Sequence, residues 1–283
     1  MSAGAGSFRK LQKKMNDNLK KIRHMALDMD GTLYLGGRLF PWTQDFLKTL
    51  REKGIGYTFL TNNPTKSVAD YLAKLAGMGI EASEDNMLTT SLAAIDWLKE
   101  NLPGARRLFM LGTPSMVSQF EKAGFEAAAD DPSGRPDALV VSFDMTLTYD
   151  RLCRAAWWAK QGVPYIATNP DRVCPTEKET VLVDCGSIQK CIEEATGRKP
   201  DIVLGKPDPT MLQDIMRRHG LAPDEVAMVG DRIYTDMAMA RNAGAVGILV
   251  LSGETTREML DSAPAGESPD FIFENVGELA RLL

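Results

Sequence analysis

MALDMDGTL at residues 25–33 joins a short apolar run to a polar turn that holds two aspartates and a glycine. The run 25–27 is apolar at successive positions, which is typical of a strand buried on both faces of a sheet. Asp28 and Asp30 follow at once, so the predicted strand ends at a pair of carboxylates. Strands of this kind occur mostly in parallel sheets covered by helices, and the segment therefore indicates an α/β fold.

The same junction of apolar run and polar cluster recurs along the chain. The apolar runs lie at 57–60, 202–204, 226–229 and 246–251, and the first three end at the polar clusters 61–63, 205–207 and 230–236. Helical patterns separate the runs, as expected for βα units of one parallel sheet. Open α/β sheets bind ligands at the carboxyl ends of their strands, so we expect the clusters to share one cleft.

About 100 residues between the clusters 61–63 and 205–207 contain βα units of their own. Their apolar runs lie at 108–111, 138–143 and 165–167. This predicts an inserted domain over 85–184, within a core formed by 25–84 and 185–283.

Composition excludes several classes of protein. The chain has 283 residues, 44% of them hydrophobic, which is enough for a sizeable core and excludes disorder and a disulfide scaffold. A formal net charge of -5 gives no general attraction to nucleic acid. The longest apolar runs are too short to span a membrane, the start resembles no signal peptide, and the four cysteines form no CxxC pair. A reduced, cytoplasmic protein with no nucleic-acid or membrane partner is expected.

The N-terminal extension 1–24 differs from the rest. It has seven Lys or Arg residues against the single acid Asp17. Apolar residues recur at helical spacing over 8–22, which predicts an amphipathic helix. We expect the helix to dock on its own protein, with a membrane surface or a partner as the alternative.

The aspartate clusters carry the strongest chemical signal. Asp28 is placed to attack a bound electrophile, while Asp30 is free to transfer protons. Asp231 and Asp236 follow another predicted strand at the start of a helix. If these carboxylates converge, a divalent cation with oxygen ligands must neutralise them, and Mg²⁺ fits best. The alternatives are a polar turn at 28–30 and helix caps at 231 and 236.

Two further clusters add hydrogen-bond donors and a cation. Thr61, Asn62 and Asn63 offer a hydroxyl and amides at a strand end, and Lys206 follows another predicted strand. Donors, a lysine and a metal together describe a phosphoryl site. Taken alone, a lysine such as Lys206 is more often an ordinary surface residue, so its location carries the argument.

With these motifs in this order, the chain resembles the haloacid dehalogenase superfamily of aspartate-nucleophile phosphatases. The matching motifs are DMDGT at 28–32, Thr61, Lys206 and GDRIYTD at 230–236. The long insert resembles the subclass with a large α/β cap, which includes p-nitrophenylphosphatase-like, pyridoxal-phosphate and nucleotide-monophosphate phosphatases. The resemblance implies a Rossmann-like, doubly wound core with a smaller α/β cap domain.

The resemblance also implies roles for individual residues. Asp28 would be the nucleophile and Asp30 the general acid and base. Mg²⁺ would be held by the Asp28 carboxylate, the Asp30 backbone carbonyl and Asp231, with Asp236 orienting the ligands or Lys206. The side chains of Thr61 and Lys206 and the backbone near residues 62 and 63 would bind the phosphoryl group.

Substrate choice is expected to lie in the cap. Asn169 and Asp171 match a motif of the family, although an ordinary Asn-Pro turn explains them equally well. We expect a small phosphorylated metabolite as substrate, and the subclass suggests a homodimer through the cap. A phosphotransferase or mutase acting on a sugar phosphate and a non-catalytic phospholigand sensor remain as alternatives.

Overall fold

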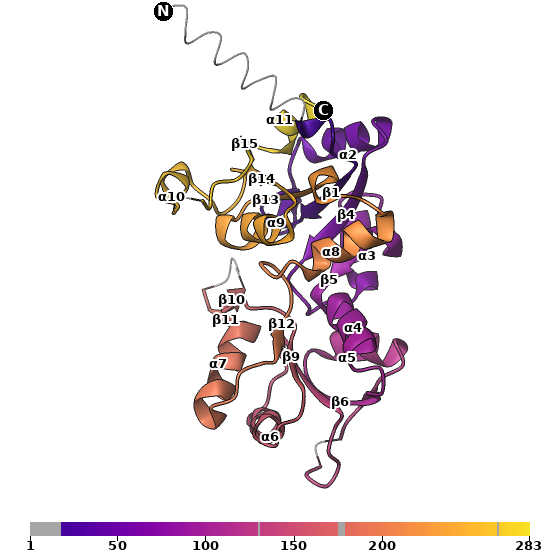
Figure 1. The fold of residues 1–283 in the computed structure, drawn as a ribbon, viewed down its shortest axis with the longest axis vertical. Coiled ribbons are helices and arrows are strands. Elements are labelled where there is room, and N and C mark those ends of the chain that lie inside the picture. Colours follow the sequence, from indigo (N-terminus) through magenta and orange to yellow (C-terminus); the bar gives the residue numbers. More distant parts are fainter. Residues whose placement is uncertain (1–17, 130, 175–178, 265) are drawn as a thin grey trace, which may run out of the picture. The chain divides into compact units, whose positions relative to one another are not determined.

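The computed structural model describes residues 18–129, 131–174, 179–264 and 266–283 (Figure 1). Its described residues form two compact units. The first contains the residues up to Leu60 together with Ala76–Met87 and Pro209–Leu283, and the second contains Thr61–Leu75 and Leu88–Asp208. The chain therefore leaves the first unit and returns to it twice.

A six-stranded sheet in the order β15-β14-β13-β1-β4-β5 organises the first unit. Parallel pairing sets β1 between β13 and β4, so that His24 lies opposite Val226 on one side and Gly56 on the other. All residues of β1 and β13 are buried, as the apolar runs predict. The strands are β1 His24–Asp28, β4 Gly56–Thr61, β5 Met87–Thr89, β13 Val226–Gly230, β14 Val246–Val250 and β15 Phe271–Phe273.

Helices and turns complete the first unit. The α2 helix buries Phe46, Leu47 and Leu50 and contacts α11. A short ribbon, β2 Tyr34–Leu35 and β3 Arg38–Leu39, follows the aspartate turn. The helices are α2 Thr43–Glu52, α8 Thr210–His219, α9 Ala238–Ala243, α10 Arg257–Asp261 and α11 Val276–Ala280, with the short turns η1 Glu84–Asn86, η2 Pro223–Glu225 and η3 Ile233–Met237; α3 Val68–Gly77 crosses the unit boundary.

The second unit has its own parallel sheet, in the order β12-β9-β8-β6-β7. Helices α4, α5 and α6 each begin after a threonine whose side chain accepts the N–H three residues later, which caps the helix. The elements are β6 Arg107–Leu111, β7 Glu126–Ala127, β8 Ala138–Val141, β9 Tyr165–Ala167, β12 Ile202–Val203, α4 Thr90–Asn101, α5 Pro114–Lys122, α6 Tyr149–Lys160 and α7 Cys185–Thr196, with an antiparallel ribbon of β10 Val173–Cys174 and β11 Leu182–Val183.

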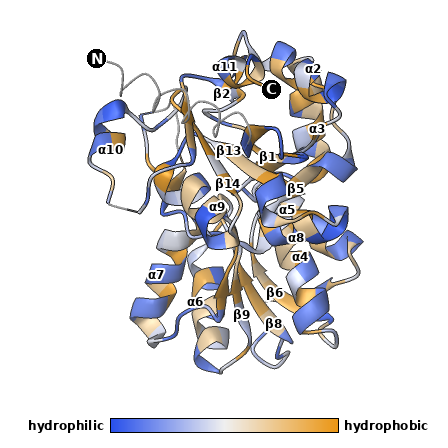
Figure 2. Cartoon of the chain, turned by 45° about the horizontal axis from the view of Figure 1, so that its top comes forward, coloured by the Kyte–Doolittle hydropathy of each residue, from blue (hydrophilic) through white to orange (hydrophobic). Residues whose placement is uncertain are grey.

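Each face of this second sheet is covered by its own apolar cluster, because side chains alternate along a strand. Phe109 and Leu139 pack with α6 and α7, whereas Leu108 and Ala138 pack with α4 and α5. Figure 2 shows these strands as the most hydrophobic part of the unit. The result is a complete α/β layer structure within the insert.

Residues 185–208 belong to this second unit. Helix α7 buries Cys185, Ile188 and Ile192 in the cluster that covers one face of its sheet. The second unit thus extends past the predicted boundary at 184 and also takes in 61–75.

One predicted strand was assigned to the wrong sheet. The run 202–204 was expected in the same parallel sheet as residues 25–27, but Ile202 pairs with Ile166 and Val203 with Ala167, in the sheet of the second unit. Leu204 is buried in that unit's core. The polar cluster 205–207 therefore follows a strand of the second sheet, and the expectation of four clusters on one sheet is wrong.

The structure confirms the predicted α/β class with a parallel sheet in each unit. Most of the predicted N-terminal helix lies outside the described residues, while Leu19 and Ile22, at its end, are buried. Within the described ranges, no helix combines the length and the apolar character needed to cross a membrane.

Candidate active site

Strand β1 ends at Asp28 and is followed by a tight turn. The Met29 carbonyl accepts the N–H of Leu33 at 2.9 Å, and the Gly31 N–H donates to the Tyr34 carbonyl at 2.8 Å. Gly31 has a φ of +88°, and a Cβ there would lie 2.5 Å from Asp231 Oδ2. Only glycine fits both the positive φ and the close approach of Asp231, which explains the glycine of the DMDGT motif.

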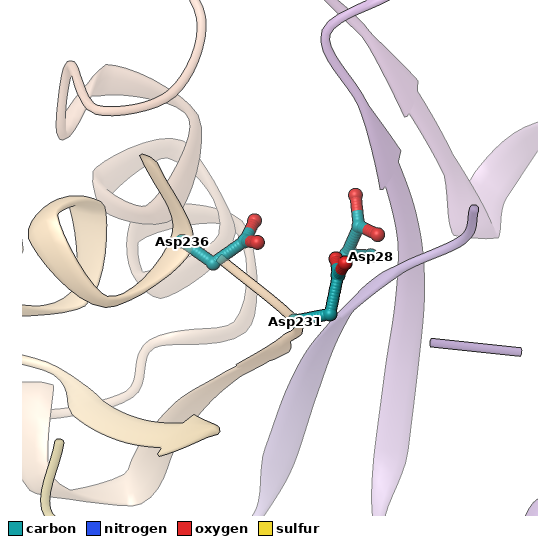
Figure 3. A group of neighbouring side chains, drawn as sticks. All are labelled: Asp28, Asp231 and Asp236. Atoms are coloured by element: carbon teal, nitrogen blue, oxygen red, sulfur yellow. The ribbon is translucent and has the colours of Figure 1, made fainter. Parts of the chain in front are cut away.

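Asp231 and Asp236 reach the same place from the end of β13. Asp231 follows the strand directly, and Asp236 lies in η3, which is one turn of π-helix. One carboxylate oxygen from each of these residues and one from Asp28 all lie within 4.8 Å of one another (Figure 3). The side chains are buried, with exposed fractions of 8% for Asp28, 2% for Asp231 and 0% for Asp236. The structure thus brings together three of the predicted aspartates, here called the carboxylate group.

Burial of like charges is unfavourable, and in the carboxylate group it shifts the pKa of Asp231. Burial, together with the neighbouring charges of Asp28 and Asp236, raises the pKa of Asp231 to about 8. Its Oδ2 accepts the Glu254 N–H at 2.6 Å, while Oδ1 is buried and has no hydrogen-bond partner within the described part of the chain. An unsatisfied carboxylate oxygen beside two other carboxylates is a donor set that suits a hard divalent cation.

Arg232 brings a positive charge next to this group. Burial acts to lower its pKa, but the charges of Glu254 and Asp231 outweigh burial and raise it. Its Nε lies 2.8 Å from Glu254 Oε2. The Arg232 guanidinium is thus paired with Glu254, and within the described part of the chain it makes no hydrogen bond to Asp231 Oδ1.

Asp30 and Asp236 differ from each other in their placement. Asp30 is exposed, and its Oδ1 accepts the Gly36 N–H at a long 3.4 Å. Such a carboxylate is accessible for proton transfer, the role predicted for it. Asp236 was expected to orient other ligands. Its side chain is itself one of the three that make up the carboxylate group, and its Oδ2 accepts the Arg232 N–H at 3.0 Å.

Lys206 lies in the second unit, where Asn62 holds its backbone. The Lys206 N–H donates to Asn62 Oδ1 at 2.7 Å, and Asn62 Nδ2 donates to the Lys206 carbonyl at 3.0 Å. Gly205 has a φ of +78°, and a Cβ there would lie 2.8 Å from Asn62 Oδ1. Lys206 is only 5% exposed. It is therefore not the ordinary surface lysine of the alternative interpretation.

The two residues proposed for the cap join the same network. Asn169 Nδ2 donates to the Asn62 carbonyl at 2.9 Å, and Asp171 Oδ2 accepts from Asn62 Nδ2 at 3.2 Å. The Asp171 N–H in turn donates to Asn169 Oδ1 at 3.1 Å. Asn62, Asn169, Asp171 and Lys206 thus form one set of hydrogen bonds, here called the amide network.

Thr61 and Asn63 form a turn beside it. Asn63 donates its N–H to Thr61 Oγ1 at 3.1 Å, and its Oδ1 accepts the N–H and hydroxyl of Thr65 at 3.0 and 2.6 Å. The Asn63 amide therefore shapes the turn. Thr61 follows Leu60 in the chain, and Leu60 is the register partner of Asp28 in the first sheet.

Several residues outside the sequence motifs support these groups. Thr90 donates its hydroxyl to the Asn62 carbonyl at 3.1 Å, and Gln189 donates to the Asn169 carbonyl at 2.7 Å. Asp184 is buried at the start of α7, where burial raises its pKa to about 7 and Asp171 adds repulsion. None of these lies in a motif, although the position of Asp184 as a helix cap is visible in the sequence.

Comparison with known proteins shows the family of the chain. A family model described as haloacid dehalogenase-like hydrolase matches residues 25–126, and a HAD-hydrolase-like model matches residues 203–279. The acid sugar phosphatase of Staphylococcus aureus is 32% identical over 260 residues, which cover 92% of this chain and 97% of that protein.

Solved structures give the same result. The crystal structure of 4-nitrophenylphosphatase from Thermotoga maritima is 43% identical and superposes with a TM-score of 0.87 over 93% of this chain and 98% of that one. The glycerol phosphate phosphatase of Mycobacterium tuberculosis, solved in complex with magnesium, is 26% identical with a TM-score of 0.84, over 93% of this chain and 78% of that one. The chain belongs to the haloacid dehalogenase-like hydrolases and is a phosphatase of that family.

Proposed function

We propose that this phosphatase is a Mg²⁺-dependent phosphomonoesterase that transfers the phosphoryl group of a small metabolite to Asp28 and then to water. The observation that carries the proposal is the carboxylate group, in which Asp231 Oδ1 is buried and lacks a hydrogen-bond partner among the described residues. Such an arrangement is costly unless a cation is bound.

The residues present fit a magnesium ion. The Asp28 carboxylate, the Asp30 backbone carbonyl and Asp231 would hold it, and the buried oxygens of Asp236 lie close enough to contribute. When bound, Mg²⁺ would neutralise the like charges and screen the repulsion between the nucleophile and the phosphate. The magnesium in the related glycerol phosphate phosphatase supports this choice of ion.

In the first half of the reaction, an oxygen of Asp28 attacks phosphorus. The bond between phosphorus and the leaving oxygen breaks, and Asp30, acting as the general acid, gives a proton to that oxygen. In the second half, water attacks the phosphorus of the aspartyl-phosphate while the Asp30 carboxylate accepts a proton. The Asp28 oxygen leaves, and the free enzyme and inorganic phosphate result.

Lys206, Thr61 and the backbone near Asn63 are proposed to bind the phosphoryl oxygens. A lysine ammonium is a compact cation that offsets both the phosphate and the attacking carboxylate. The two hydrogen bonds from Asn62 to the Lys206 backbone support this role, because they fix the point from which the ammonium extends.

We propose a sugar phosphate or a similarly small phosphorylated metabolite as the substrate. The acid sugar phosphatase of S. aureus supports this class, and Asn169 and Asp171 would contact the part of the substrate beyond the phosphate. A homodimer through the second unit and a cytoplasmic location stay predictions.

The test is a phosphate-release screen of about a hundred phosphorylated metabolites with Mg²⁺, with Asp28→Asn as the blank. Release of inorganic phosphate from a subset of sugar phosphates by the wild type alone is the expected result. Isomerised substrate without free phosphate would instead indicate a mutase. Flat activity over the whole panel would overturn the proposal in favour of a phospholigand sensor.

A further inference from the structure

We propose that the segment Ser252–Thr255, here called the 252–255 loop, positions Asp231 so that Oδ1 is the oxygen offered to the divalent cation. The loop connects β14 to α10 and belongs to the first unit. The inference rests on the proposed function, because it concerns the same metal site. Nothing in the sequence motifs pointed to this loop.

Two backbone N–H groups of the loop hold Asp231. Glu254 donates to Asp231 Oδ2 at 2.6 Å, and Thr255 donates to the Asp231 backbone carbonyl at 3.2 Å. A short hydrogen bond to a carboxylate is a strong one and fixes the rotation of the side chain. Since Oδ2 is engaged, the buried Oδ1 is left to bind a cation.

Two glycines lie against this carboxylate. A Cβ on Gly253 would lie 2.0 Å from Asp231 Oδ2, and a Cβ on Gly31 would lie 2.5 Å from the same atom. Gly253 has no left-handed φ, so space alone demands glycine at that position. The carboxylate therefore lies in a slot that two backbones form by close approach.

The loop is also tied to the turn that follows the nucleophile. Ser252 Oγ donates to the Gly31 carbonyl at 2.8 Å, a contact between residues 221 positions apart in the chain. On its other side, the Glu254 side chain contacts Arg232 and the Tyr234 hydroxyl. The loop thus joins the two segments that carry Asp28 and Asp231. Loss of the contact with Gly31 or of the contacts with Arg232 and Tyr234 would let the Asp231 carboxylate move.

Two substitutions in the loop test this role. Ser252→Ala removes the tie to Gly31 and leaves every ligand in place. Gly253→Ala forces the loop away from Asp231 Oδ2. Ser262→Ala is the matched control, because its hydroxyl donates to the nearby Met259 carbonyl at the end of α10, outside the 252–255 loop.

The measurement is calorimetric titration of the full-length, metal-free chain with Mn²⁺, with circular dichroism to show that each variant is folded. The wild type and Ser262→Ala should bind with the same affinity. Ser252→Ala should bind about 5-fold more weakly, the usual effect of one neutral hydrogen bond. Gly253→Ala should bind roughly 10- to 100-fold more weakly, as is found when groups that orient metal ligands are changed.

A second measurement separates positioning from simple destabilisation. Hydrolysis of 4-nitrophenyl phosphate by Ser252→Ala should need more metal for half-maximal rate, while KM at saturating metal stays within about twofold of the wild type. If Gly253→Ala does not fold, Ser252→Ala decides. If folded Ser252→Ala binds Mn²⁺ with unchanged affinity, the inference about the loop is overturned and the proposed function is not affected. If the wild type does not bind Mn²⁺, the proposed function is overturned as well.

Discussion

The carboxylate group and the amide network differ in how their buried polar atoms are hydrogen-bonded. The carboxylate group gathers three acidic side chains, with one oxygen of Asp231 left without a protein partner among the described residues. The amide network satisfies Asn62 and Asn169 with each other and with the backbone of Lys206. The first therefore offers a buried, unpaired oxygen to the proposed cation, whereas the hydrogen bonds of the second are made within the chain. Metal should accordingly change the stability of the first and leave the second unaffected.

This difference also separates two kinds of functional residue. In the proposed mechanism Asp28 acts through its own carboxylate, so its loss should remove the reaction. Asn62 would act through the position of Lys206, so its loss should weaken both the fold and the site.

The largest effect is expected for Asp28→Asn. The amide cannot form an acyl phosphate, so phosphate release should fall by about 10⁴-fold or more, as for other nucleophile substitutions. Steady-state assay against the best substrate of the screen checks this. Residual activity within tenfold of the wild type would rule out Asp28 as the nucleophile.

Lys206→Ala should lower kcat by about 10²- to 10³-fold, the usual cost of removing one electrostatic contact to the transition state. The fold should remain, because Asn62 bonds to backbone atoms of Lys206 that alanine keeps. Steady-state kinetics test the predicted loss of kcat, and a melting curve tests whether the fold remains. A variant that is fully active would show that the lysine plays no part in phosphoryl transfer.

Asn62→Ala should destabilise the protein by about 2–3 kcal/mol, because the buried Lys206 peptide loses two hydrogen bonds. Melting temperature should fall by roughly 5–10 °C, to the same extent with EDTA and with Mg²⁺. Asn101→Ala is the control, since that side chain bonds only to the Trp97 carbonyl at the surface. Full rescue of Asn62→Ala by Mg²⁺ would break the distinction between the two regions.

The pH dependence of the metal-free protein should show the smallest effect. The pKa of Asp231 is raised from 3.8 to about 8 by burial and then by Asp28 and Asp236. The folded state thus keeps a proton that the unfolded state loses, and stability falls as pH rises towards 8. Melting temperature in EDTA should drop by a few degrees between pH 6.5 and 8.5.

Two controls accompany this measurement. Saturating Mg²⁺ should remove the drop, because the cation replaces the proton, and Asp231→Asn should remove it even in EDTA. Identical slopes in EDTA and in Mg²⁺ for the wild type would show that no cation binds at the carboxylate group.

The sequence predicted the carboxylate group well because its residues follow buried strands directly. Asp28 ends β1 and Asp231 directly follows β13, and these strands are neighbours in a parallel sheet, so pattern alone places the two residues together. The position of Asp236 inside the group could not be read in this way, since it depends on one turn of π-helix that has no periodic signature.

The strand 202–204 was misassigned for a related reason. Its apolar residues fit either sheet, and only its pairing with Ile166 and Ala167 separates the two possibilities. The 252–255 loop was missed because its contacts with Asp231 are made by backbone N–H groups, which any sequence carries. The role of Gly253 depends on a close approach that is visible only in three dimensions.

The most direct test of the central claim is an anomalous difference map from a crystal soaked in Mn²⁺. A single peak at bonding distance from the Asp28 carboxylate and from Asp231 Oδ1, with Oδ2 still on the Glu254 N–H, is the predicted result. No peak at the carboxylate group, or a peak bound through Asp231 Oδ2, would contradict the account.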